Sequence, residues 1–360
     1  MSTPSKSASS LELCLTRAWL RRGPLACALW PVSLVFWAIS AVRRRFYRWG
    51  VLRSTRLPVP VVVVGNIFIG GTGKTPLTIW LVQALQQAGM KPGVISRGHG
   101  SVDGLPRRVT PDSTPQQVGD EPLLIAQRTA CPVMVGRDRV QAGRALLQAC
   151  PEIDILLTDD GLQHYALQRD LEIVLFDGRG AGNGWLLPAG PLREGVSRRR
   201  DFTVINAPVM TPSLLAALAI DDSGARGSGS APVQMQLTGQ HAERLSRRSE
   251  RIALSALAQA APRIVAAAGI GNPGRFFAML KSLGLDFAEL PLPDHHDFLD
   301  RPFAALEADV ILITEKDAVK CRQIEELKDD LRLWVVPVTA QIDDAMAQLI
   351  VEKCRGCSIA

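Results

Sequence analysis

The sequence predicts an α/β protein with a doubly wound, largely parallel sheet that carries a phosphate-binding loop (P-loop). It also predicts a second, smaller α/β domain and a membrane-associated helix near the N-terminus. Three observations lead to this prediction. Strand-like and helix-like segments alternate along most of the 360 residues, a glycine-rich turn separates a strand from a helix at residues 70–75, and residues 24–42 contain no charge. The chain is long enough for two domains with proper cores.

The composition is that of a folded protein, with 47% apolar and 21% charged residues. The net charge of +6 is modest, and many arginines lie before residue 57. The sequence has no zinc-finger spacing and no basic recognition helix, so we expect no nucleic-acid binding. The seven cysteines are odd in number and dispersed, which is typical of a reducing compartment, and we interpret Cys354 and Cys357 as an incidental pair.

The uncharged run at residues 24–42 is the first predicted element. Nineteen helical residues span about 28 Å, close to the ~30 Å hydrocarbon core of a bilayer. Arginines flank both ends, and the larger group follows the run, which favours a cytoplasmic location for the rest of the chain. The alternatives are a buried core helix and a cleaved signal peptide, but the latter would export a P-loop away from ATP. We predict membrane attachment and leave open whether the helix spans the bilayer or is embedded in one leaflet.

The first domain is predicted from an alternation of strands and helices. The expected strands are residues 59–64, 92–96, 132–135, 153–158 and 171–177. The expected helices are residues 78–87, 121–128 and 140–149. Such alternation predicts a mainly parallel sheet that binds ligands at the carboxyl ends of its strands.

The second domain is predicted to be a smaller α/β unit. Its expected strands are residues 263–268, 310–314 and 333–338, with a helix at residues 275–283. The glycines of residues 269–274 resemble a dinucleotide-binding motif, but their spacing favours a simple strand-to-helix turn. We expect a membrane-associated segment at 1–50, a P-loop domain at 51–220, a flexible stretch at 221–232, the smaller domain at 233–338 and a C-terminal segment at 339–360.

The turn after the first strand predicts a nucleotide site. It comprises Phe68, Ile69, Gly70, Gly71, Thr72, Gly73, Lys74 and Thr75. Backbone N–H groups and a helix N-terminus would face the phosphates, Lys74 would approach the β/γ oxygens, and the Thr75 hydroxyl could bind Mg²⁺. Phe68 stands where the usual motif has a glycine, and we expect Gly70 and Gly71 to supply the flexibility instead.

Two pairs of carboxylates are candidates for metal and proton chemistry. Asp159 and Asp160 end a strand, which is where nucleotide-binding sheets hold Mg²⁺, although such a pair could also cap a helix. Asp120 and Glu121 open a helix, where acidic residues are favourable on structural grounds alone. The functional alternative is that these two face the γ-phosphate, one orienting the attacking hydroxyl and the other joining the metal.

The remaining candidates are histidines and one charged pair. His295 and His296 follow one another in the second domain, so their side chains diverge, and pairing of one with a carboxylate is a better interpretation than a metal site. That role requires the two domains to face each other across a cleft. His164 is nearly as plausible an acid–base residue, while Arg193 and Glu194 could contact an anionic substrate or simply stabilise a loop.

Several of these motifs together resemble one family. The segments VGNIFIGGTGKTP, ISRGHG, GDEP, TDDGLQH, LLPAGPLRE, PDHHDF and ITEKDAVK occur in the order found in the tetraacyldisaccharide 4'-kinases of lipid A biosynthesis, across residues 11–338. The resemblance implies transfer of the ATP γ-phosphate to the 4'-hydroxyl of a lipid A disaccharide 1-phosphate. It places the protein at the cytoplasmic face of the bacterial inner membrane, with this lipid precursor as partner and with no obligate protein partner.

The resemblance also implies residue roles. Asp120 would be the base, paired with His295, while Lys74 would act on the phosphates. Thr75, Glu121, Asp159 and Asp160 would surround Mg²⁺. His99 stands where the family more often has tyrosine, which leaves its role open. A short two-stranded link would join the domains, and residues 233–237 and 333–338 are the candidates for it.

The alternative function is a membrane-associated P-loop ATPase or GTPase switch. A GTPase reads guanine with Asn/Thr-Lys-x-Asp, but in Thr314-Glu315-Lys316-Asp317 the lysine and the aspartate are adjacent, which is the wrong spacing. A switch would bind or hydrolyse nucleotide without a glycolipid, whereas a kinase should do little without its acceptor.

Overall fold

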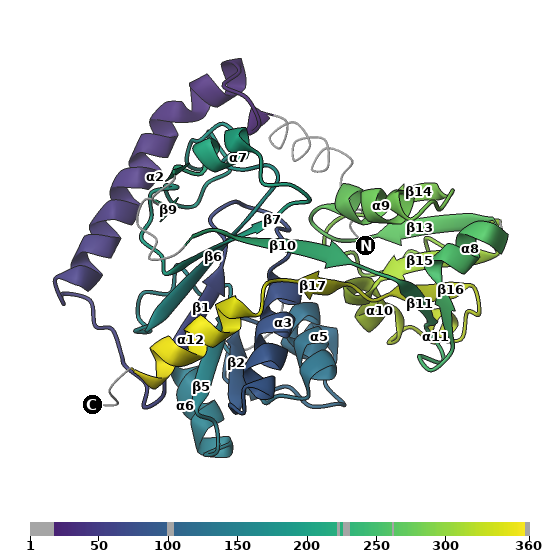
Figure 1. Ribbon diagram of the computed structural model, residues 1–360, viewed down its shortest axis with the longest axis horizontal. Coiled ribbons are helices and arrows are strands. Elements are labelled where there is room, and N and C mark those ends of the chain that lie inside the picture. Colours follow the sequence, from purple (N-terminus) through teal and green to yellow (C-terminus); the bar gives the residue numbers. More distant parts are fainter. Residues whose placement is uncertain (1–17, 99–103, 222–223, 226–230, 261–262, 357–360) are drawn as a thin grey trace.

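The computed structural model describes residues 18–98, 104–221, 224–225, 231–260 and 263–356. They form two large sheets, each covered by helices, a short two-stranded sheet, and one long helix that lies along the side of the first sheet (Figure 1). We call the nine-stranded sheet with its helices the first domain and the six-stranded sheet with its helices the second domain.

The first domain is the predicted doubly wound sheet. Its strand order is β17-β10-β7-β6-β1-β5-β2-β4-β3, parallel except for the two edge strands β3 and β17. In chain order the strands are β1 Val61–Gly65, β2 Pro92–Ser96, β3 Arg107–Arg108, β4 Val133–Val135, β5 Ile155–Asp159, β6 Leu171–Asp177, β7 Phe202–Asn206, β10 Val233–Thr238 and β17 Thr339–Gln341. The apolar strand β1 lies between β5 and β6, so its carboxyl end opens at the centre of the sheet.

Helices cover both faces of this sheet because its strands are apolar on both sides. The helices are α3 Lys74–Gln87, α4 Pro115–Val118, α5 Asp120–Thr129, α6 Arg139–Ala149, α7 Pro212–Ala217 and α12 Ala345–Arg355. One core lies between the sheet and α3, α5 and α12, and a second core lies on the α6 face. The chain also pairs Ile220–Asp221 (β8) with Gly224–Ala225 (β9), while most of the expected flexible stretch 221–232 lies outside the described residues.

The second domain is a smaller sheet with the order β12-β11-β16-β15-β13-β14. Its strands are β11 His241–Arg244, β12 Arg251–Ala253, β13 Ile264–Ala268, β14 Ala288–Pro291, β15 Val310–Thr314 and β16 Leu333–Val336, and its helices are α8 Leu254–Ala260, α9 Pro273–Ser282, α10 Glu315–Cys321 and α11 Glu325–Lys328. Strands β13 to β16 pair in parallel, and the glycine-rich turn after β13 leads into α9.

The sheet pairing corrects the expected link and domain division. The candidate link strand at residues 333–338 is wrong, because β16 pairs with β15 and β11 inside the second domain. The expected strand at residues 233–237 lies in β10, whose partners are β7 and the later strand β17. The chain therefore leaves the first domain along β10 and returns along β17, so residues 233–238 and 339–355 belong to the first sheet and its helices.

The N-terminal helix α2, Pro24–Arg48, is longer than the uncharged run because residues 43–48, which include four arginines, continue it. Its most apolar window of 18 residues has a mean hydropathy of 2.0 and is only 11% buried, so the core-helix alternative is wrong. The buried Ser33 fastens α2 to the first domain, since its hydroxyl donates to the Leu186 carbonyl and accepts from Ala189 N–H, both at 2.9 Å. By length and composition α2 is a candidate for membrane attachment.

Candidate functional site

The P-loop joins β1 to α3 and is braced from within. The Asn66 amide donates to the carbonyls of Phe68 (2.6 Å) and Gly70 (3.2 Å) and to the Thr72 hydroxyl (3.0 Å). Its carbonyl accepts from Lys74 Nζ at 3.2 Å. One side chain at the end of β1 therefore fixes both the curve of the loop and the position of its lysine, leaving the backbone N–H groups of the turn to face a ligand.

Phe68 occupies the position where the common motif has glycine, and it is part of the core. It is 3% exposed, and the guanidinium of Arg179 lies 4.2 Å from the centre of its ring. The backbone conformation that needs glycine occurs later in the turn, at Gly70 and Gly73, with φ of +95° and +101°. The expectation named Gly70 and Gly71: it is confirmed at Gly70, whereas the second such angle occurs at Gly73 and not at Gly71.

The second domain lies directly against the P-loop. A Cβ added to Gly271, in the turn after β13, would lie 2.6 Å from the Gly71 nitrogen. Arg275 of α9 donates to the Thr72 carbonyl (3.1 Å), and the Asn206 amide donates to the same carbonyl at 2.9 Å. The turn at residues 269–274 is thus the surface on which the P-loop rests.

Asp159 and Asp160, at the carboxyl end of β5, take different partners, as expected for adjacent side chains. Asp160 accepts from Arg193 at 3.2 Å with each of its oxygens and lies 3.7 Å from Lys74 Nζ. Burial alone would raise the pKa of Asp160, but the charges of Lys74 and Arg193 outweigh it and lower that pKa. Arg193, the expected substrate contact, is therefore held at the phosphate end of the sheet by Asp160.

Asp159 has the character of a cation ligand. Its Oδ2 atom is buried without a hydrogen-bond partner among the described residues, and its Oδ1 atom lies 3.4 Å from the Thr78 hydroxyl. Burial, reinforced by the negative charge of Glu121, raises the pKa of Asp159 to about 7, against the opposing effect of Lys74. A buried carboxylate oxygen without a donor, close enough to Glu121 and Asp160 to be affected by their charge, fits Mg²⁺, which prefers hard oxygen ligands.

Asp120 and His295 meet across the two domains. Asp120 begins α5 and is 5% exposed, and its Oδ2 atom lies 3.0 Å from Nδ1 of His295. Burial opposes ionisation of Asp120, yet the hydrogen bond from His295 and the charge of Lys316 together hold its pKa below the usual range. The same hydrogen bond raises the pKa of His295. The sequence analysis expected a histidine of the second domain to pair with a carboxylate if the two domains face each other, and the structure contains such a pair in Asp120 and His295.

Two lysines of α10 face this pair. Lys316 Nζ lies 3.0 Å from Glu121 Oε1 and 4.0 Å from Asp120 Oδ2, and burial, which would lower the pKa of Lys316, is outweighed by these carboxylates, so that pKa is raised. Lys320 Nζ lies 3.6 Å from Asp120 Oδ2. The second domain thus supplies cations where the first domain supplies carboxylates.

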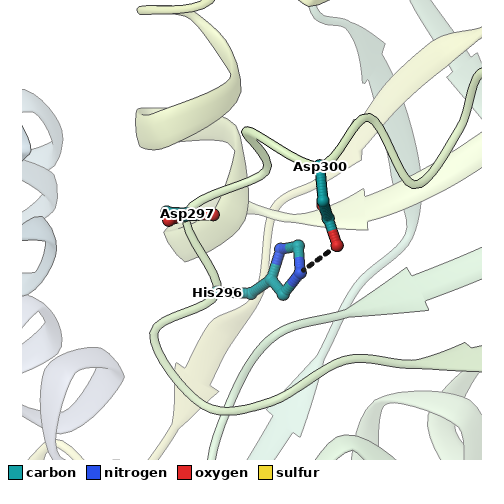
Figure 2. A group of neighbouring side chains, drawn as sticks. All are labelled: His296, Asp297 and Asp300. Atoms are coloured by element: carbon teal, nitrogen blue, oxygen red, sulfur yellow. Dashed lines mark ion pairs between the residues drawn. The ribbon is translucent and has the colours of Figure 1, made fainter. Parts of the chain in front are cut away.

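The structure distinguishes His295 from His296. Figure 2 shows the imidazole of His296 turned toward Asp300, with its Nε2 atom 3.4 Å from the carboxylate. The other nitrogen, Nδ1, accepts from the Phe298 N–H at 3.1 Å. Asp297 lies near enough that one ligand atom from each of the three falls within 4.8 Å of the others, but both carboxylates are exposed and one imidazole nitrogen is already engaged. His296 therefore stabilises the loop, whereas His295, with φ of +58°, faces Asp120.

Three further candidates lie elsewhere. Glu194 accepts from Gln163 (3.0 Å), Tyr165 (2.8 Å) and Arg198 (2.6 Å) in a buried network that stabilises its loop. His164 lies 3.9 Å from Asp138, and burial, followed by the charge of Arg139, lowers its pKa to about 4, so it stays neutral near pH 7. His99 is outside the described residues.

Sequence reasoning missed four residues of the site. They are Asn66, Arg275, Lys316 and Lys320. Asn66 directly follows the first strand, and both lysines lie in the motif ITEKDAVK, so their positions beside known motifs were the available signal. As a whole the site can hold a nucleoside triphosphate with Mg²⁺, keep a carboxylate ionised beside the phosphates, and move a proton through an aspartate–histidine pair.

Comparison with known proteins supports this chemistry. The family model described as "Tetraacyldisaccharide-1-P 4'-kinase" matches residues 25–355. A tetraacyldisaccharide 4'-kinase of Janthinobacterium sp. (strain Marseille) is 64% identical over 98% of this chain and 99% of its own, and that of Leptothrix cholodnii is 47% identical over 93% of both.

A solved structure gives the same result for the fold. LpxK of Aquifex aeolicus, crystallised with ATP, aligns with a TM-score of 0.73 at 27% identity, covering 91% of this chain and 99% of that one. The likeness therefore includes both domains. On its sequence, its fold and its site, this chain belongs to the tetraacyldisaccharide-1-P 4'-kinase family, LpxK.

Proposed function

We propose that the protein transfers the γ-phosphate of ATP to the 4'-hydroxyl of tetraacyldisaccharide 1-phosphate, a lipid A precursor, at the cytoplasmic face of the inner membrane. The observation that carries the proposal is the Asp120–His295 pair, at 3.0 Å, contributed by two domains that meet at a P-loop. A phosphoryl acceptor needs a group that orients its hydroxyl, and this carboxylate lies among phosphate-binding residues.

The first domain would bind and align the triphosphate. Backbone N–H groups of the P-loop and the N-terminus of α3 receive the β- and γ-phosphates, and Lys74, fixed by Asn66 at 3.2 Å, neutralises the transferring group. Thr75, Asp159, Asp160 and Glu121 are the residues that would hold Mg²⁺, which supplies charge neutralisation when bound. Alignment and charge are most of what phosphoryl transfer requires.

The proton would leave the acceptor through Asp120. In a loose transition state the hydroxyl keeps its proton until late, so an ionised carboxylate of low pKa suffices to orient it and then accept that proton. His295 holds the carboxylate through Oδ2 and can share the proton through Nδ1. Transfer therefore requires both domains in the arrangement seen here.

The acceptor would lie between α2 and the first domain. A cavity of about 830 Å³ there is lined by six arginines and four carboxylates, with Trp37, Arg44 and Arg48 contributed by α2. An anionic sugar phosphate suits the arginines. Acyl chains suit the exposed apolar side chains of α2, among them Val35 (58% exposed) and Ile39 (64% exposed), and the same side chains would attach the protein to the membrane.

The test is acceptor-dependent transfer by the purified, detergent-solubilised chain. Labelled ATP and Mg²⁺ should yield labelled glycolipid, and Asp120→Ala should lower kcat by about 10²- to 10⁴-fold with ATP still bound. Phosphate release equal with and without lipid would instead indicate the ATPase switch. Near-normal transfer by Asp120→Ala would disprove the assignment of the base.

A further inference from the structure

Lys320 is a buried cation at the domain interface, and the mechanism proposed above gives it no role. Its side chain is 9% exposed, and Nζ lies 3.6 Å from Asp120 Oδ2 and 3.7 Å from Asp317 Oδ1, at 5.5 Å from the centre of the Phe298 ring. Among the described residues Nζ has no hydrogen-bond partner. A buried ammonium in such a place is costly unless nearby carboxylates compensate it, and here one carboxylate comes from each domain.

Asp317 is the other member of this arrangement and is 1% exposed. Its Oδ2 atom accepts from the Gly269 N–H (3.0 Å) and from the Thr314 hydroxyl (2.7 Å). Its Oδ1 atom faces Lys320 and has no hydrogen-bond partner among the described residues. Burial, which the charge of Lys320 only partly offsets, raises the pKa of Asp317.

The two contacts of Asp317 lead to the two members of the acid–base pair. On one side, Gly269 accepts through its carbonyl from the backbone N–H of His295 at 3.2 Å, within the loop where His295 adopts φ of +58°. On the other side, Lys320 spans from Asp317 to Asp120 in the opposite domain. One buried carboxylate is therefore linked to His295 through backbone and to Asp120 through a lysine.

We propose that Asp317 and Lys320 form a positioning pair that holds Asp120 and His295 in productive alignment across the domain interface. The proposal rests on the roles proposed above for Asp120 and His295. A lysine at i+3 from an aspartate on one helix could serve that helix alone, but Lys320 is buried and approaches a carboxylate contributed by the other domain. Its function is therefore expected to depend on the presence of the Asp120 carboxylate.

A double-mutant cycle tests this dependence. Lys320→Met should lower kcat about 10- to 100-fold, because misplacing a reacting group by a fraction of an ångström is costly, while KM for ATP stays within about twofold. In the Asp120→Ala background the same substitution should change kcat less than about twofold. Lys320→Arg should restore part of the activity, and Asp317→Asn should reproduce the loss seen with Lys320→Met.

Arg128→Met is the matched control, because it removes another ion-paired cation, partly buried with 23% of its side chain exposed, from the same interface of α5 and α10. Arg128 Nη1 lies 2.6 Å from Glu315, which keeps Arg248 at 3.2 Å as a second partner. This variant should retain its kcat. An equal loss in Arg128→Met would mean general loosening of the interface and would overturn the proposal.

The two proposals fail in different ways. Equal losses from Lys320→Met in the native and Asp120→Ala backgrounds would overturn the positioning role while leaving Asp120 as the base. Near-normal turnover in the Asp120→Ala variant would disprove the role of Asp120 as the base. The positioning role proposed for Lys320 would then fail as well, because it rests on that base.

Discussion

The two domains meet through the same local pattern, a parallel strand, a glycine-rich turn and a helix, yet only one of the turns is built for phosphate. In the first domain the turn at residues 70–75 ends in Lys74 and Thr75 and is braced by Asn66. In the second domain the turn at residues 269–274 contains Pro273, and its backbone at Gly271 rests on the first turn.

This difference shows that glycines in such a turn predict its backbone conformation, whereas the side chains that follow them predict which ligand it binds. Glycines permit a backbone conformation or a close approach, and both turns use them in that way. The ligand is determined by the side chains that follow, and here the charges are also divided, with carboxylates on the first domain and Lys316, Lys320 and Arg275 on the second. The site is complete only where the two sets of charges meet.

The largest effect should come from Lys74, the first residue of α3, compared with Arg275 in the first turn of α9. Lys74→Ala should lower kcat by about 10³-fold, because it removes charge from the transferring phosphoryl group. Arg275→Ala, which loses a hydrogen bond to the Thr72 carbonyl, should cost less than about tenfold. Steady-state transfer from labelled ATP measures both, and similar losses would mean that the second turn also contacts phosphate.

The next effect separates neighbouring histidines of the second domain. His295→Ala should lower kcat by about 10²-fold, since it removes the partner of Asp120. His296→Ala should keep kcat within about threefold and lower Tm instead, because the imidazole accepts the Phe298 N–H and packs on its ring at 4.8 Å. Reversal of these two outcomes would exchange the roles of the histidines.

The contact between the turns can be tested by adding one methyl group. Gly271→Ala would place a Cβ 2.6 Å from the Gly71 nitrogen, and overpacking of this kind costs roughly 1–3 kcal/mol, so kcat/KM for ATP should fall about tenfold. Gly274→Ala is the control, because its nearest neighbouring atom lies at 3.8 Å. If both variants behave like the native protein, the turns do not need to touch during turnover.

The smallest effect should be on KM for the lipid acceptor, in a variant that alters neither of the two glycine-rich turns. Arg48→Ser removes one cation from the cavity beside α2, and a single arginine near an anionic lipid contributes about 1 kcal/mol. KM for the lipid should rise about fivefold, with KM for ATP unchanged. A change in KM for ATP alone would place the acceptor elsewhere.

Much of the fold could be predicted from the sequence, because the identified strands and helices are recognisable from the apolar pattern of their own residues. β2, β6 and β15 have the predicted bounds, and the helices of the first domain differ by a few residues at their ends. Strand β7 was not identified, although it is fully buried, because its five residues show no clear period after a run of arginines. The pairing of β10 with β17 was missed because it joins segments a hundred residues apart.

The site was predicted unevenly for a similar reason. The P-loop and Asp120 can be recognised from sequence motifs. The pairing of Asp120 with His295 was implied by a family resemblance, and in the structure Asp120 Oδ2 lies 3.0 Å from His295 Nδ1. Lys316 and Lys320 lie in the motif ITEKDAVK, but that motif alone does not assign them a role in the site. Their charge matters because α10 is packed beside α5, which only the tertiary structure establishes.

The return of the chain along β17 has a consequence for biosynthesis of the protein. Until residues 339–341 leave the ribosome, β10 is an edge strand with unpaired backbone groups, and α12 has not yet covered α3 with Met346 and Ile350. The second domain, contained between β10 and β17, can fold before the first is closed. A chain that ends before β17 therefore exposes a strand edge and an apolar helix face together, so we expect residues 339–355 to be needed for solubility.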